Sequence, residues 1–118
     1  MFRLRALARM WYSFDMSTTY FHVTPRRNVP SILDRGIRLE FVRGRINGIW
    51  MCDAARLPWA VQHISRWQRC RPEDLSILEL DMKGATLRHI REGVKVYHDH
   101  VPGEWIKDVN FYAVGEPQ

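Results

Sequence analysis

Arginine is the residue type in this chain best suited to bind an anion. Arg26 and Arg27 form one pair near the start, and Arg43 and Arg45 form a second pair around a glycine. A guanidinium group can bind phosphate oxygens through two parallel hydrogen bonds, so these side chains are candidates to hold the phosphates of a nucleotide or of a nucleic-acid backbone. The alternative is ordinary solvated loop charge, and the residues alone do not decide between the two.

Two further groups have the residue types of a metal or thiol site. His98, Asp99 and His100 place two imidazoles two residues apart, which on a strand would point both to one face. A third ligand is missing, so we predict no metal. Cys52 and Cys70 form neither a CxxC pair nor a zinc-finger spacing, which favours two free thiols in a reducing compartment. We expect Cys52 to be buried and not to act as a nucleophile.

The sequence alone does not decide the roles of a histidine near the start of the chain and of an acid near its end. His22 lies in the middle of an expected strand, residues 18–24, where a histidine is commonly a core residue satisfied by a backbone carbonyl. Glu104 lies in an expected tight loop, residues 101–106, where a solvated carboxylate is the ordinary outcome. Neither residue identifies a function by itself.

The elements that must position these side chains alternate between strands and short helices. We expect helices at residues 29–35, capped by Asn28 and ended by Gly36, and from about residue 54 to Trp67. Arg66, Arg69 and Arg71 then lie at a helix end, as a surface feature or as a patch for an anionic partner. Residues 37–47 are expected to form a loop with at most a short strand, and residues 87–91 are ambiguous. Further strands are expected at residues 18–24, 48–53, 75–82, 93–98 and 109–114.

Length and composition limit the classes of protein that fit. The chain has 118 residues, 46% hydrophobic and 26% charged, which fits one globular domain at residues 17–118. Residues 1–16 form an extension that could be helical. The order of elements predicts an α+β fold with a mostly antiparallel sheet and two or three short helices. The net charge of +5 favours an anionic partner. No apolar stretch is long enough for a bilayer, so we expect a cytoplasmic protein, a monomer or weak dimer, without membrane contact.

Three segments together resemble the ADP-ribosyltransferase-like superfamily. YFHVTPRRNVPSILDRGI at residues 20–37 resembles the opening of its small members, in which a strand with a histidine and a hydroxyl residue precedes a short helix. The same opening occurs in RNA 2′-phosphotransferases and in bacterial toxins that ADP-ribosylate DNA bases. GIWMC at residues 48–52 and VPGEWI at residues 101–106 are similar to a second strand and to an element with the catalytic glutamate.

The resemblance implies a split sheet, NAD as the bound cofactor and roles for particular residues. Glu104 and His22 would be catalytic, with Glu104 stabilising the oxocarbenium-like transition state that forms when nicotinamide leaves the ribose. His22 would bind a ribose hydroxyl, with Thr24 in support. The other residues implied to contact NAD are Arg26, Ser31 and Trp50. Arg27, Arg43 and Arg45 would hold phosphate or nucleic acid.

Three functions are compatible with this pattern. The first is NAD-dependent transfer of ADP-ribose to a nucleic-acid or protein acceptor, as in a toxin. The second is a non-enzymatic basic module, such as a phage or mobile-element inhibitor, that masks nucleic acid or an acidic protein surface. The third is an NAD-dependent RNA 2′-phosphotransferase, which ranks lowest because the Arg-His pair that precedes the first strand in that family is not evident here.

Overall fold

The computed structural model describes residues 18–42 and 46–111, and these form one α+β domain around an antiparallel sheet of six strands. The two α-helices are α2 (Val29–Arg35) and α3 (Leu57–Gln68). The strands lie in the order β4-β5-β2-β1-β3-β6. Their bounds are β1 Thr19–Pro25, β2 Ile49–Cys52, β3 Leu75–Asp81, β4 Arg88–Arg91, β5 Val94–Tyr97 and β6 Ile106–Phe111. The α+β class and the antiparallel sheet predicted from the sequence are thereby confirmed.

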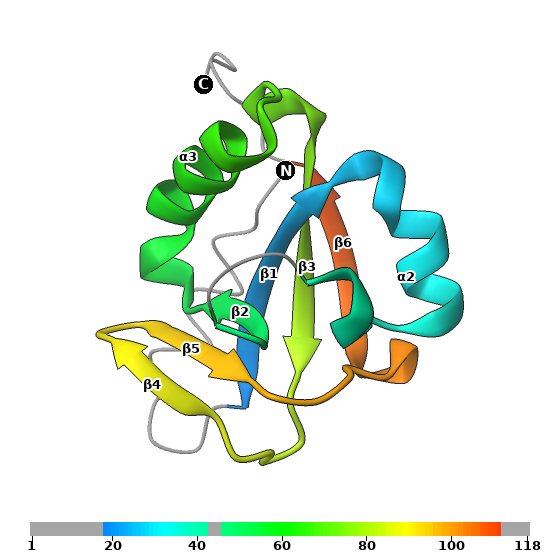
Figure 1. Ribbon diagram of the computed structural model, residues 1–118, viewed down its shortest axis with the longest axis vertical. Coiled ribbons are helices and arrows are strands. Elements are labelled where there is room, and N and C mark those ends of the chain that lie inside the picture. Colours follow the sequence, from blue (N-terminus) through cyan, green and yellow to red (C-terminus); the bar gives the residue numbers. More distant parts are fainter. Residues whose placement is uncertain (1–17, 43–45, 112–118) are drawn as a thin grey trace.

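The sheet consists of two antiparallel halves that meet at one residue pair. Strand β1 pairs with β3 along its whole length, from Thr19 opposite Asp81 to Pro25 opposite Leu75. Between β1 and β2, in contrast, only Phe21 and Cys52 are in register. The half made of β4, β5 and β2 therefore turns away from the half made of β1, β3 and β6 (Figure 1).

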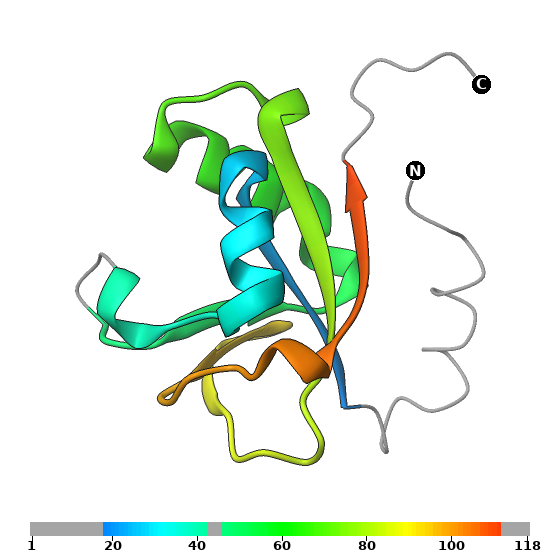
Figure 2. The same ribbon diagram turned by 90° about the vertical axis from the view of Figure 1, so that its right-hand side faces the viewer.

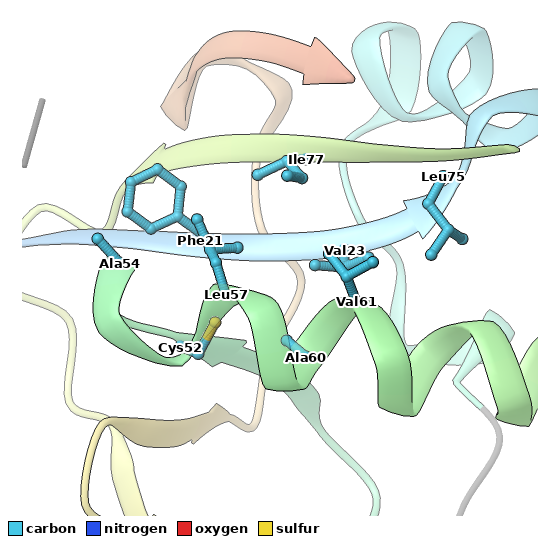
Figure 3. Close-up of a cluster of buried hydrophobic side chains, with 9 residues drawn as sticks. All are labelled: Phe21, Val23, Cys52, Ala54, Leu57, Ala60, Val61, Leu75 and Ile77. Carbon is cyan, nitrogen blue, oxygen red and sulfur yellow. The ribbon is translucent and has the colours of Figure 1, made fainter. Parts of the chain in front are cut away.

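Each face of the β1–β3–β6 half is covered by one helix, and Figures 1 and 2 show α3 and α2 on opposite sides of it. Successive side chains of a strand point to opposite faces, so Phe21 and Val23 face α3, whereas Tyr20, His22 and Thr24 face the α2 side. The α3 side holds a buried cluster of Phe21, Val23, Cys52, Ala54, Leu57, Ala60, Val61, Leu75 and Ile77 (Figure 3). The buried cluster on the α2 side consists of Ile32, Ile37, Ile49, Met51, Leu78, Leu80, Met82 and Val101.

Helix α2 has the predicted bounds because its two ends are determined locally. Pro30 is tolerated in the first turn, and Gly36 ends the helix with a positive φ of 81° that favours glycine. The Gly36 N–H donates to the Ile32 carbonyl at 2.7 Å. Asn28 is the N-cap residue of α2, as predicted, but its side chain forms no capping hydrogen bond. Its amide donates instead to the Thr24 hydroxyl at 3.2 Å.

Several other boundaries differ from the prediction. The last strand begins at Ile106, three residues before the expected 109, because β6 pairs with β3 through a bulge between Glu79 and Leu80 that breaks the alternation along the strand. Residues 101–106 contain a 3₁₀ turn, η5 (Gly103–Trp105). Residues 88–91 form β4. The predicted helical extension at residues 1–16 lies outside the described residues.

No described helix has both the length and the apolar character needed to cross a membrane.

Candidate functional site

The His22 imidazole lies where the two halves of the sheet part. Its Nδ1 is 2.7 Å from the backbone carbonyl oxygen of Trp50, across the gap that opens one residue beyond the Phe21–Cys52 pair. A carbonyl oxygen only accepts, so Nδ1 must carry the proton and donate. In the neutral ring, Nε2 is then a free acceptor. The structure thus fixes both the tautomer and the orientation of the ring.

The half-buried position of His22 keeps this ring neutral. Burial lowers the pKa of His22 below its ordinary value of 6.5, and the hydrogen bond to the Trp50 carbonyl opposes that shift only in part. At neutral pH the side chain therefore offers a hydrogen-bond acceptor at Nε2 and no positive charge. Such a group suits a hydroxyl donor better than a phosphate.

Hydroxyl groups lie beside His22 on the same face of β1 and β3. Thr24 is buried and accepts the hydrogen bond from Asn28. Ser76 is opposite Thr24 in the register and is 0% exposed, and its Oγ has no hydrogen-bond partner among the described residues. A buried hydroxyl without a partner is uncommon in folded proteins. Sequence analysis did not select Ser76, because only the register with β1 brings it to this face.

A small hollow opens on the same side, next to the first residues of β1. Tyr20 alternates with His22 on β1, and its pKa is raised by burial and by the Asp53 charge. The hollow has a volume of about 130 Å³ and is lined by Thr18, Tyr20, Met82, Gly84, Ala85, Leu87 and Lys95. Tyr20 and Lys95 come from the two different halves of the sheet, so this hollow lies between them.

Glu104 lies on the α2 side of the sheet, in η5. Turn η5 packs against the end of α2, so closely that a Cβ on Gly103 would come within 2.9 Å of the Leu33 carbonyl oxygen. The carboxylate of Glu104 is exposed, and no hydrogen bond or ion pair involves it among the described residues. It is therefore free to bind a ligand.

His22 and Glu104 are not in contact with each other. His22 is opposite Leu78 on β3, and Leu78 is opposite Val109 on β6, whereas Glu104 comes before Ile106 at the start of β6. Strand β3 thus separates the two side chains by two strand spacings across the sheet, about 10 Å, and Glu104 is also displaced by several residues along the strands, so the two groups lie farther apart than that. Leu78 between them is 0% exposed and is packed in the buried cluster that includes Ile32 of α2. A ligand that contacts both groups must therefore pass around this cluster and not across it.

Trp50 and Ser31 were also predicted to contact NAD, and the structure places them on different elements. Trp50 gives His22 its backbone carbonyl, while alternation along β2 puts its indole on the Cys52 side of the strand, so stacking of the indole on nicotinamide stays a prediction. Ser31 is exposed on α2. Its proposed contact with NAD likewise stays a prediction.

Of the arginines predicted to bind phosphate, only the first pair is described. Arg26 already has partners, because its Nη2 donates to the Glu73 carbonyl at 2.7 Å and its guanidinium lies 4.1 Å from the centre of the Phe111 ring. Arg27 is exposed and forms no ion pair with any described residue. Arg43 and Arg45 lie outside the described residues.

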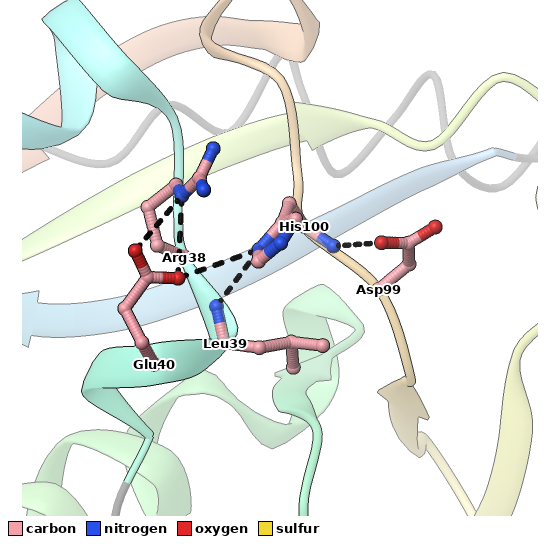
Figure 4. A network of polar contacts seen from close by, with 5 residues as sticks. All are labelled: Arg38, Leu39, Glu40, Asp99 and His100. Atoms are coloured by element: carbon pink, nitrogen blue, oxygen red, sulfur yellow. Dashed lines mark hydrogen bonds and ion pairs between the residues drawn. The ribbon is translucent and has the colours of Figure 1, made fainter.

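His98 and His100 do not share a strand face, because β5 ends at Tyr97. His98 Nδ1 donates to the Asn47 carbonyl at 2.9 Å. His100 Nδ1 accepts from the Leu39 N–H at 3.0 Å and lies 3.9 Å from a Glu40 carboxylate oxygen (Figure 4). Each ring thus anchors a different loop segment. The described residues contain no group of three side chains that could hold a metal ion.

Cys52 is buried, as expected from the sequence. Burial raises the pKa of its thiol to about 12, and the neighbouring Asp53 charge acts in the same direction. A thiol with this pKa holds almost no thiolate at neutral pH, so Cys52 cannot serve as a nucleophile.

Comparison with known proteins adds no family assignment, since no protein-family model matches the chain and a search of curated proteins gives no significant match.

Proposed function

We propose that this chain is an ADP-ribosyltransferase-like protein that uses NAD and transfers ADP-ribose to a nucleic-acid or protein acceptor. The observation that carries the proposal is the His22–Trp50 hydrogen bond at the point where the sheet splits. It leaves Nε2 of a neutral imidazole as an acceptor with no hydrogen-bond partner among the described residues. A ribose hydroxyl can donate a hydrogen bond to such a nitrogen.

The neighbourhood of His22 fits a ribose and its flanking groups. The Thr24 hydroxyl lies on the same face of β1 as His22, and the hollow at Tyr20 and Lys95 supplies space between the two halves. The Ser76 hydroxyl is 0% exposed and lies too deep to contact a ligand directly. Arg27, which is exposed and forms no ion pair with any described residue, is free to meet a phosphate. The resemblance of residues 20–37 to the opening of small ADP-ribosyltransferases supports the same assignment.

The chemistry assigned to Glu104 is electrostatic. Cleavage of the bond between nicotinamide and ribose leaves positive charge on the sugar. A carboxylate about 4 Å from that charge stabilises it by roughly 4 kcal/mol at an effective dielectric constant near 20. If this energy is gained only in the transition state, it corresponds to about a thousandfold in rate. Glu104 is exposed and unpaired in the described structure, so it needs no other bond to be broken first.

The test is the rate of NAD cleavage, measured as release of nicotinamide with and without added nucleic acid. Glu104→Gln keeps the size of the side chain and removes the charge, so we expect a loss of about 100-fold to 1000-fold. Glu92→Gln is the matched control, because Glu92 is also an exposed acid but contacts Arg56 instead. A folded Glu104→Gln protein with the activity of the wild type would refute the catalytic assignment.

A second candidate is a non-enzymatic module that binds an anionic surface. It is favoured by one observation, the separation of His22 and Glu104 by the buried Leu78. This candidate predicts binding to a polyanion with steep salt dependence and no effect of Glu104→Gln. The same nicotinamide-release assay therefore separates the two functions.

A further inference from the structure

The exposed side of α3 carries a stripe of aromatic rings. Leu57, Ala60, Val61 and Ile64 point toward the sheet and pack in the core. Trp59, His63 and Trp67 follow one another at intervals of four residues along one flank, which places them in line. Trp59 is 37% exposed and Trp67 is 57% exposed, so the stripe is open to solvent.

The first part of this stripe is an ordered stack. The Trp59 and His63 rings are 5.1 Å apart between centroids, with an angle of 17° between their planes. The Arg91 guanidinium, from β4, lies 4.1 Å from the centre of the Trp59 ring. Two elements far apart in the sequence thus build one surface. Because His63 and Arg91 both lie against the Trp59 ring, Trp59 is already stacked and holds its neighbours in place. The rings left for a partner to stack on are those of His63 and Trp67.

The charged side chains that α3 and β4 contribute are all basic. Neither α3 nor β4 contains an aspartate or a glutamate. Arg66, beside His63 on the helix, and Arg91 form no ion pair with any described residue. The acid nearest in sequence to Arg91 is Glu92, and its carboxylate binds Arg56 at 3.3 Å. The exposed rings are therefore flanked by cations whose charge is not neutralised.

We propose that the stripe of Trp59, His63 and Trp67, with Arg66 and Arg91, is a binding surface for single-stranded nucleic acid. Unpaired bases stack on aromatic side chains, while arginines bind the phosphates between them. His63 and Trp67 lie about 6 Å apart along the helix axis, at 1.5 Å per helical residue, so each of these two open rings can stack with one base of a short single strand. Stacking and phosphate contacts do not recognise the sugar, so DNA and RNA bind alike.

This surface lies on the opposite face of the sheet from His22 and goes beyond the proposed function. It needs neither NAD nor Glu104. Two other partners fit less well. An interfacial membrane helix needs outward aliphatic side chains, and every leucine, isoleucine and valine of α3 points inward. Duplex nucleic acid hides the faces of its bases within its own stack and leaves the rings of α3 without a partner.

Fluorescence anisotropy with labelled oligo(dT) and oligo(U) of 12 nucleotides, and with a 12-base-pair duplex, tests the proposal on the full chain. We expect both single strands to bind within a fewfold of each other and the duplex to bind more weakly. Trp67→Ala should weaken single-strand binding about tenfold. Phe41→Ala is the matched control, because Phe41 is 68% exposed but lies outside α3, and it should bind like the wild type.

The dependence on salt tests the arginines separately. Arg66→Gln should reduce the slope of log Kd against log salt by about 0.7, the value for one phosphate contact on a single strand. Arg35→Gln, an exposed arginine on α2, should leave the slope unchanged. Circular dichroism and thermal melting confirm that each variant is folded.

Three results would overturn the proposal: no binding by the wild type at low salt, equal affinity for duplex and single strand, or wild-type affinity in folded Trp67→Ala. Glu104→Gln should bind the oligonucleotides like the wild type. Failure of the nucleic-acid surface and failure of the transferase function are therefore distinguishable.

Discussion

Replacement of Gly36 by alanine should loosen the contact that holds η5, and with it Glu104, against α2. Gly36 has a φ of 81°, and an added Cβ would lie 2.2 Å from the carbonyl oxygen of Val101. Real Cβ atoms do not approach an oxygen so closely, so the backbone must move. The neighbouring Ile37 forms two hydrogen bonds with Val101, at 2.8 and 2.9 Å, that such a shift would break.

The expected loss of stability follows from these contacts. A backbone with a φ of 81° and a ψ of −177° is adopted almost only by glycine and costs another residue on the order of 1–3 kcal/mol. Loss of the two Ile37–Val101 hydrogen bonds adds about 1 kcal/mol each. Gly36→Ala should therefore lower the free energy of unfolding by about 3–5 kcal/mol. Gly84→Ala is the control, because Gly84 has a similar φ of 74° but no atom within 4 Å of its added Cβ, so about 1–2 kcal/mol is expected.

Urea unfolding followed by circular dichroism measures both variants. We expect Gly36→Ala to be the less stable of the two by about 2–3 kcal/mol. Nicotinamide release should also fall in Gly36→Ala under conditions where the protein is still folded, because Glu104 is displaced. Equal losses of stability in the two variants would show that the clash with Val101 costs nothing.

Three further outcomes follow from the ionisable groups. Ellman's reagent should label Cys70 in the native protein and leave Cys52 unreacted, because burial raises the pKa of the Cys52 thiol to about 12; two thiols reacting at one rate would contradict this. Burial lowers the pKa of His22, so the unfolded chain takes up a proton below about pH 6.5 before the folded one does. The urea midpoint should therefore fall more between pH 7.5 and pH 5.5 in the wild type than in His22→Phe. An equal fall in both proteins would show that His22 does not contribute to the loss of stability in acid. Thr18→Val should raise the lowered pKa of Asp81 toward its ordinary 3.8, seen by NMR titration, because the Thr18 hydroxyl donates to that carboxylate at 2.6 Å; an unchanged titration would show that this bond does not cause the shift.

The elements bounded by local signals could be predicted from the sequence. Helix α2 has the expected bounds, because Pro30 and Gly36 act on the backbone next to them whatever the rest of the chain does. The start of β6 could not be predicted, because its pairing with β3 through a bulge depends on a strand more than twenty residues away. Asn28 occupies the N-cap position without forming a capping bond, because the 3₁₀ turn Arg26–Asn28 leads directly into α2 and the Asn28 amide donates to Thr24, four residues earlier.

In the candidate site, too, the sequence identifies individual residues, whereas their contacts depend on the fold. His22 was selected from the sequence, but the tautomer of its ring depends on the Trp50 carbonyl, and that contact arises only where the sheet splits. Ser76 was missed because register alone places it beside Thr24. The spacing of Trp59 and His63 was visible in the sequence, whereas the contribution of Arg91 was not.

Calorimetric titration with NAD tests whether His22 accepts a hydrogen bond from a ribose hydroxyl. We expect saturable heat with the wild-type chain, at least tenfold weaker binding in folded His22→Ala, and retained binding in Glu104→Gln. Absence of heat with the wild type, or wild-type affinity in folded His22→Ala, would contradict it.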